Sequence, residues 1–147
     1  MNMIAEDILS DLAYAQQYLS KKKTSIVAIK DGEIIGEKMG FGLRPFLELI
    51  DEQGNVLSKT VLGDRILGKA SALLCRYSQV RGVYSPQGTK SAIALLIMEG
   101  IPCQIDQMIP FIQNKKGDDQ CPFEHLLEKV NDPTEAYQVL QEKIMTP

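Results

Sequence analysis

The chain has 147 residues and a formal net charge of -3, with 16 lysines and arginines against 19 acidic residues. This length predicts one domain over residues 1–147 with its own hydrophobic core. The basic residues are dispersed except at 21–23, which excludes a general electrostatic attraction to nucleic acid. The longest apolar run, residues 92–98, is far shorter than the ~20 residues of a membrane span. We therefore expect a cytoplasmic protein that binds neither nucleic acid nor membranes.

The first third of the chain predicts a helix followed by a β-hairpin. Apolar residues recur at helical spacing over residues 3–20, which predicts an amphipathic helix. Residues 24–30 and 33–39 have the composition of two strands. Asp31-Gly32 between them is a dipeptide favoured in type I′ turns, so the two strands should form a hairpin.

A glycine loop then interrupts the pattern before the next helix. Gly40 and Gly42 precede Pro45, which is well placed in the first turn of a helix. A loop of this kind before a helix start is a candidate anion site, and the alternative is a plain tight turn. A strand near residues 57–63 and a helix at about 65–77 should follow.

The second half of the chain alternates strands with helices. We expect a strand at residues 79–85, a turn at 86–89, a helix at 90–98 and a short strand at 101–105. The apolar piece at 108–112 is either an added strand or a loop that packs onto the core.

Two further helices are expected within residues 122–145. A polar loop over 114–120 leads to a helix over 121–130, and Asp132-Pro133 starts the last helix with an N-cap acid followed by a proline. Strands that alternate with helices after an opening hairpin predict a three-layer α/β/α domain with a mixed sheet.

Residues 83–101 resemble the strand–helix unit of the cytidine-deaminase-like superfamily, and the expected order of elements is similar to the order in that superfamily. In deaminases the two corresponding helices open with a His/Cys-Ala-Glu motif and a Pro-Cys-x-x-Cys motif, which assemble the zinc site. The matching places here, 68–70 and 88–92, carry no Cys, His or Glu. The resemblance therefore implies a cytidine-deaminase-like fold without zinc deaminase activity.

Nearly the whole chain also resembles a small uncharacterised prokaryotic family, a domain of unknown function in that superfamily that lacks the zinc motifs. The resembling pieces are Gly40-x-Gly42-x-x-Pro45, Asp64-x-x-x-Gly68-Lys69-Ala70, Cys121-Pro122-x-Glu124 and the helix start at Asp132-Pro133. This resemblance implies no particular activity. It points to the same polar positions as the chemistry of the residues themselves.

The turn between the expected strand and helix around Asp64 is the first candidate site. Ligands of α/β folds bind where a strand ends and the next helix begins, so Asp64 and Lys69 could face one pocket. Lys69 is a candidate partner for a phosphate or carboxylate, or a base, and the alternative is an ion pair with Asp64 that fixes the turn. Gly68, expected inside the helix, indicates close packing or close approach of a ligand.

Three cations lie near the starts of expected helices: Arg44, Lys69 and Lys90. Cations at these places oppose the helix dipole unless an anion or a carboxylate offsets them. With the glycines at 40, 42 and 68, they predict a binding site for an anionic, nucleotide-like small molecule.

Cys121 is the second candidate for catalysis, as a nucleophile or a redox thiol assisted by Asp64 or Lys69. It stands just before a helix that starts with proline, where the positive helix end favours the nucleophilic thiolate. Glu124 is expected to complete a capping arrangement and is a candidate ligand-binding residue. The alternative is a small buried or capping cysteine, and a dyad with the neighbouring His125 is not expected.

The three cysteines at 75, 103 and 121 have no disulfide or zinc-binding spacing, so we expect reduced thiols, no metal and no cofactor. Three hypotheses remain open. The first is a small-molecule binding protein without zinc chemistry, the second is an enzyme that uses Cys121, and the third is a structural or interaction module. In the third case residues 108–112 would form the contact of a homodimer.

Overall fold

The computed structural model describes residues 5–114, 116–117 and 119–146, and the following account is confined to them. Six strands form one mixed sheet. The strands are β1 (Ile26–Lys30), β2 (Glu33–Lys38), β3 (Val61–Asp64), β4 (Ile66–Leu67), β5 (Gly82–Thr89) and β6 (Cys103–Ile109). Strands β2, β1, β3 and β5 follow one another across the sheet, and β1 is antiparallel to both of its neighbours. The short β4 pairs with β5 beyond the end of β3, and β6 pairs with β5 in parallel on its other side.

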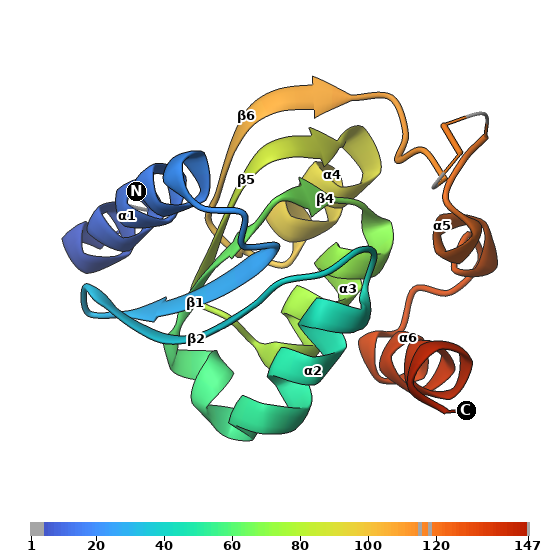
Figure 1. Ribbon diagram of the computed structural model, residues 1–147, viewed down its shortest axis with the longest axis horizontal. Helices are drawn as coiled ribbons and strands as arrows, with labels where there is room; N and C mark the ends of the chain where they lie inside the picture. The colour runs from blue at the N-terminus through green and yellow to red at the C-terminus, as the bar shows by residue number, and fades with distance from the viewer. Residues whose placement is uncertain (1–4, 115, 118, 147) are drawn as a thin grey trace.

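Helices cover both faces of this sheet (Figure 1). The helical segments are α1 (Glu6–Lys21), α2 (Arg44–Gln53), a 3-10 turn (Gly54–Lys59), α3 (Lys69–Ser78), α4 (Lys90–Met98), α5 (Pro122–Leu126), α6 (Pro133–Leu140) and a π-helical turn (Gln141–Met145). Helix α1 buries Leu12, Ala15 and Leu19 against one face. Helices α2, α3 and α4 cover the other face, and α6 packs against α3. None of the described helices is long and apolar enough to cross a membrane.

The predicted hairpin is confirmed. Asp31 and Gly32 have φ angles of 51° and 80°, as a type I′ turn requires. The buried carboxylate of Asp11 on α1 accepts hydrogen bonds from the N–H groups of both turn residues, at 3.1 and 2.9 Å. The turn is therefore held from outside the hairpin as well as by its own sequence.

Two strands differ from the prediction. The expected strand over 57–63 begins only at Val61, because the chain first makes a 3-10 turn that buries Leu57 in the core. Strand β5 continues through the expected turn at 86–89 although it contains Pro86. The hydroxyl of Ser85 donates to the carbonyl of Gln87 and accepts from its N–H group, and the gap between β3 and β4 lies opposite this point. Pro86 thus falls where the ladder is already interrupted.

The C-terminal half keeps the predicted order with changed lengths. Strand β6 includes the first part of the apolar piece at 108–112, and the helix expected over 121–130 is the short α5. The start of the last helix is confirmed, since a carboxylate oxygen of Asp132 accepts a hydrogen bond from the N–H of Glu135 at 2.8 Å. The start of the helix near residue 68 differs: β4 intervenes, and Gly68 is the N-cap of α3 and not an interior residue.

Candidate functional site

A cavity of about 220 Å³ lies at the N-terminal end of α3, and we call it the Asp64 cavity. Its walls come from the loop at 40–43, the end of β3, the first turns of α3, the segment at 112–113 and the start of α5. The lining residues are Ser25, Gly40, Phe41, Gly42, Leu43, Asp64, Arg65, Ile66, Ser71, Ile112, Gln113, Cys121 and Glu124. Five positions singled out in the sequence therefore meet here, namely those at 40, 42, 64, 121 and 124.

Asp64 brings unused hydrogen-bonding capacity to this cavity. Its side chain is buried, with 8% of the residue exposed, and its Oδ2 atom has no hydrogen-bond partner among the described residues. Burial raises the pKa of this carboxyl to about 7, while the hydroxyl of Ser71 and the backbone N–H of Ile66 act in the opposite direction. Near neutral pH both forms of the carboxyl are populated, so Asp64 can accept or donate a proton there.

Glu124 occupies the N-terminus of α3. Its Oε1 atom accepts a hydrogen bond from the N–H of Lys69 at 2.8 Å, and its Oε2 atom accepts one from the N–H of Ala70 at 2.9 Å. A Cβ atom at Gly68 would lie 2.4 Å from this Oε1 atom, so only glycine leaves room for the carboxylate. The anion predicted at this helix start is thus a side chain of the protein itself.

The ammonium group of Lys69 is engaged just after α5 and makes no ion pair with Asp64 among the described residues. It donates to the carbonyl oxygens of Leu127 and Glu128, both at 2.9 Å, just after α5. The ion pair considered between Lys69 and Asp64 is absent from the described residues, where Asp64 Oδ2 stays without a partner. Lys69 and Glu124 together fasten α5 to the start of α3.

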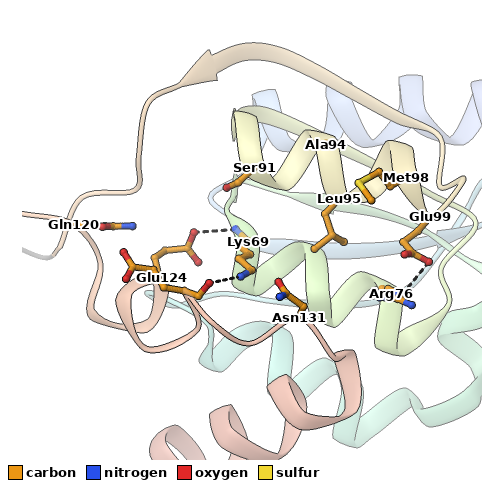
Figure 2. A pocket seen from close by; sticks show the side chains of 11 residues that line it. Lys69, Arg76, Ser91, Ala94, Leu95, Met98, Glu99, Gln120, Glu124 and Asn131 are labelled. Atoms are coloured by element: carbon orange, nitrogen blue, oxygen red, sulfur yellow. Dashed lines mark hydrogen bonds and ion pairs between the residues drawn. The ribbon is translucent and has the colours of Figure 1, made fainter.

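A second, larger hollow of about 560 Å³ also has Glu124 on its wall (Figure 2). Helix α4 supplies Ala94, Leu95 and Met98 to one wall, and the ion pair between Arg76 and Glu99 closes one end at 3.0 Å. Figure 2 shows Lys69 and Glu124 joined at the opposite end of this groove. Glu124 lines both hollows.

The three predicted cations do not come together. The guanidinium of Arg44 donates to the carbonyl of Ile144 at 2.6 Å and lines a separate hollow beside α5. Lys90 is exposed at the start of α4 and lines neither of the two hollows described above. Each of the three cations therefore has a different environment, and no shared anion site arises from them.

Cys121 is the half-buried residue just before α5, and it lines the Asp64 cavity. Its N–H donates to the carbonyl of Ile112 at 2.7 Å, which fixes the chain where it enters α5. His125 lies on the exposed side of this helix, 3.6 Å from a carboxylate oxygen of Glu128. Cys75 is buried in the core, and Cys103 is half-buried on β6.

Within the described ranges, no group of three or more His, Cys, Asp and Glu side chains converges on a point where a metal ion would bind. Arg65, which the sequence did not single out, also lines the cavity, but its guanidinium donates to the carbonyls of Leu19, Lys22 and Thr24 at the end of α1. The apolar walls and Ser71 were missed as well, since no local pattern marks residues that meet only in the folded chain.

The comparisons with known proteins assign a family and no activity. Residues 14–144 match the family model described as TM1506, a domain of unknown function (DUF1893). No curated protein matches the chain. The crystal structure of a DUF1893 family protein (TM1506) from Thermotoga maritima at 2.70 Å resolution is similar, with 28% sequence identity and a TM-score of 0.86 over 98% of this chain and 97% of that chain. Since the family model spans most of its length, the chain belongs to the DUF1893 family.

Proposed function

We propose that this protein binds a compact polar molecule in the Asp64 cavity and that the carboxyl of Asp64 is the group that recognises it. The observation that carries the proposal is the buried Oδ2 atom of Asp64, which has no partner beside a cavity. A buried polar atom without a hydrogen bond costs roughly 1–3 kcal/mol. A ligand that donates an N–H or O–H group to Oδ2 would remove this penalty on binding.

The surroundings of Asp64 favour a donor over an anion. Glu124 is a second acidic side chain on the cavity wall, and the guanidinium of Arg65 is engaged with three carbonyls. The volume of about 220 Å³ is below the roughly 300–1,000 Å³ of typical ligand pockets, which fits a small molecule or one part of a larger one. We therefore propose a neutral or cationic ligand with N–H donors. The anionic, nucleotide-like ligand predicted from the sequence is the alternative against which this ligand class is tested.

Thermal-shift measurements on two ligand panels test this proposal. One panel holds small amines and nitrogen heterocycles, and the other holds phosphorylated metabolites. We expect only members of the first panel to stabilise the wild-type protein, and we expect Asp64→Leu to lose the shift while Arg44→Ala keeps it. Stabilisation by phosphorylated compounds that Asp64→Leu leaves unchanged would contradict the proposal.

A second candidate function, catalysis by the Cys121 thiol, is supported by its position on the wall of the cavity that holds Asp64. A carboxyl that exchanges its proton near neutral pH suits a general acid or base beside a nucleophile. If the two groups act together, the alkylation rate of Cys121 should follow the ionisation of Asp64 around pH 7, and Asp64→Asn should abolish this dependence. Equal rates in wild type and Asp64→Asn at every pH would rule the candidate out.

We also propose that the fold is related to the cytidine-deaminase-like superfamily. The support is the order of the main elements, with one helix, an antiparallel hairpin and then helices alternating with parallel strands. The residues at 68–70 and 88–92 do lie at the starts of α3 and α4, where that superfamily carries its zinc motifs. A relation of this kind would make the Asp64 cavity the counterpart of a catalytic pocket without zinc ligands.

A further inference from the structure

Among the described residues, the outer edge of β6 is a free sheet edge. Strand β6 pairs with β5 on one side, and no other described strand pairs with it (Figure 1). The N–H of Val83 donates to the carbonyl of Pro102, so the parallel ladder uses the even-numbered residues of β6. The N–H and C=O groups of Ile105 and Gln107 therefore point outward, away from β5. An edge of this kind is a template for pairing with another strand.

Helices flank this edge on both faces of the sheet. On one face α1 lies beside β6, because the side-chain amide of Gln16 donates to a carboxylate oxygen of Asp106 at 3.1 Å. Leu9 and Ala13 precede Gln16 by seven and three positions, so they lie on the same side of α1. Both are exposed, Leu9 to 49%. The edge of the sheet is therefore accompanied by an apolar stripe of α1.

The other face repeats this arrangement with α4, which packs against β6. Its residue Ile97 is 65% exposed, and Ile93 one turn earlier is half-buried. Met108 adds an exposed apolar side chain on β6 itself. Three adjacent layers thus present apolar side chains at one edge of the molecule.

Charged residues are few on α4 and β6. Lys90 is the one charged residue in the sequence of α4, and Asp106 is the one in β6. Asp106 is held by Gln16 and by the hydroxyl of Tyr84, which donates to its other oxygen. Depletion of charge around exposed apolar residues is typical of the centre of a protein interface. Edge strands that avoid pairing usually contain lysine or proline or are covered by a helix or loop. Strand β6 contains neither lysine nor proline.

We propose that this edge is the interface of a homodimer in which β6 pairs in antiparallel fashion with β6 of a second copy. A partner must supply a strand for the sheet and a helix for each of its faces at matching spacing. The same edge of a second copy, rotated about a two-fold axis perpendicular to the sheet, supplies all three. It sets α1 beside α1, α4 beside α4 and makes one continuous sheet of the two six-stranded sheets.

Charge also fits this arrangement. The two copies of α4 run antiparallel across the axis, so Lys90 at the start of one lies toward the C-terminal end of the other. That end carries the negative pole of the helix dipole, which attracts a lysine. No residue of α1, β6 or α4 lines the Asp64 cavity, so the dimer leaves the cavity open and does not depend on the proposed ligand.

Light scattering coupled to gel filtration tests the interface with three variants. Ile97→Lys puts one positive charge on α4 of each copy, inside the proposed contact. Gln107→Pro removes an N–H group that the register of β6 turns away from β5. Met39→Lys is the matched control, because Met39 is 64% exposed but lies at the end of β2, on the opposite edge of the sheet.

We expect the wild type and Met39→Lys to have twice the 16.4 kDa mass of the chain. Ile97→Lys and Gln107→Pro should each raise the dissociation constant at least about tenfold. Circular dichroism of the monomeric fractions should match the wild type, since both positions are exposed. A monomeric wild type, or a dimer that survives both substitutions, would overturn the proposal.

Discussion

Helices α3 and α4 both begin next to polar turns, yet their first N–H groups are satisfied in different ways. At α4 the hydroxyl of Thr89 accepts from the N–H of Ala92, three residues away. At α3 the carboxylate of Glu124 accepts from Lys69 and Ala70, which are 55 and 54 positions away. The start of α4 is capped by its local sequence, whereas the start of α3 is capped only in the tertiary structure. A site at the start of α3 therefore depends on how firmly α5 is held.

Gly68 is the most sensitive point of this arrangement. In Gly68→Ala the new methyl group would meet Glu124 Oε1 and Ile112 Cδ1, both at 2.4 Å, so α5 would have to move away from α3. We expect a loss of about 3 kcal/mol in the free energy of unfolding, at the upper end for an overpacked site. Urea denaturation measures this loss.

The matched control for Gly68→Ala is the same substitution in a Glu124→Ala background. Removal of the carboxylate relieves one of the two clashes, so the alanine at position 68 should cost clearly less there. Equal losses in both backgrounds would show that the space at Gly68 does not serve the docking of Glu124.

Removal of the Glu124 side chain should cost somewhat less free energy of unfolding than the clash that Gly68→Ala creates. Glu124→Ala leaves two N–H groups at the start of α3 without an acceptor, and we expect a loss of about 2–3 kcal/mol. Glu124→Gln keeps the shape and one acceptor oxygen, so it should lose about half as much.

The start of α3 in Glu124→Ala allows a second measurement of how this helix is capped. With its N–H groups free, α3 of Glu124→Ala should bind anions, so millimolar phosphate should raise the melting temperature of this variant and leave the wild type unchanged. A wild type that phosphate stabilises equally would show that Glu124 does not occupy the anion position of α3.

The raised pKa of Asp64 predicts that the stability of the protein falls as the pH rises. Its pKa rises from 3.8 to about 7 on folding because burial disfavours the charged form, so the folded protein holds a proton that the unfolded chain has already released. Stability from this group is present below about pH 4 and is lost as the pH rises to about 7. The wild type should be about 2 kcal/mol less stable at pH 7 than at pH 5 through this group.

Asp64→Asn isolates the effect, because the amide is similar in shape and does not titrate in this range. Its stability should differ little between pH 5 and pH 7, in contrast to the wild type, when melting temperatures of both are compared. The same pH profile in both proteins would mean that Asp64 is ionised normally in the folded state.

Local rules predicted most of the fold. The turn at Asp31-Gly32, the cap at Asp132 and the periodicity of α1 depend on neighbours within a few residues, so their sequence signals survive in the structure. The errors occurred where distant contacts decide. Pro86 continues a strand because the neighbouring ladder is broken beside it.

The sequence pointed to part of the lining of the Asp64 cavity and not to the roles of those residues. Asp64, Cys121 and Glu124 were singled out, and the cavity joins them. Lys69 was expected to meet a ligand, but its ammonium group binds two carbonyls after α5. No sequence pattern reveals a partner nearly sixty positions away, so the difference between a ligand-binding lysine and a structural one appears only with the fold.

Thr89→Ala should have the smallest effect and completes the comparison. Loss of one local cap at α4 should cost about 1 kcal/mol, because the N–H of Ala92 loses its acceptor while the packing of the helix stays intact. Thr89→Ser keeps the hydroxyl and should remain close to the wild type. If Thr89→Ala destabilised the protein as much as Glu124→Ala, the tertiary cap of α3 would contribute no more than a local one, and α5 would have no special hold on the site.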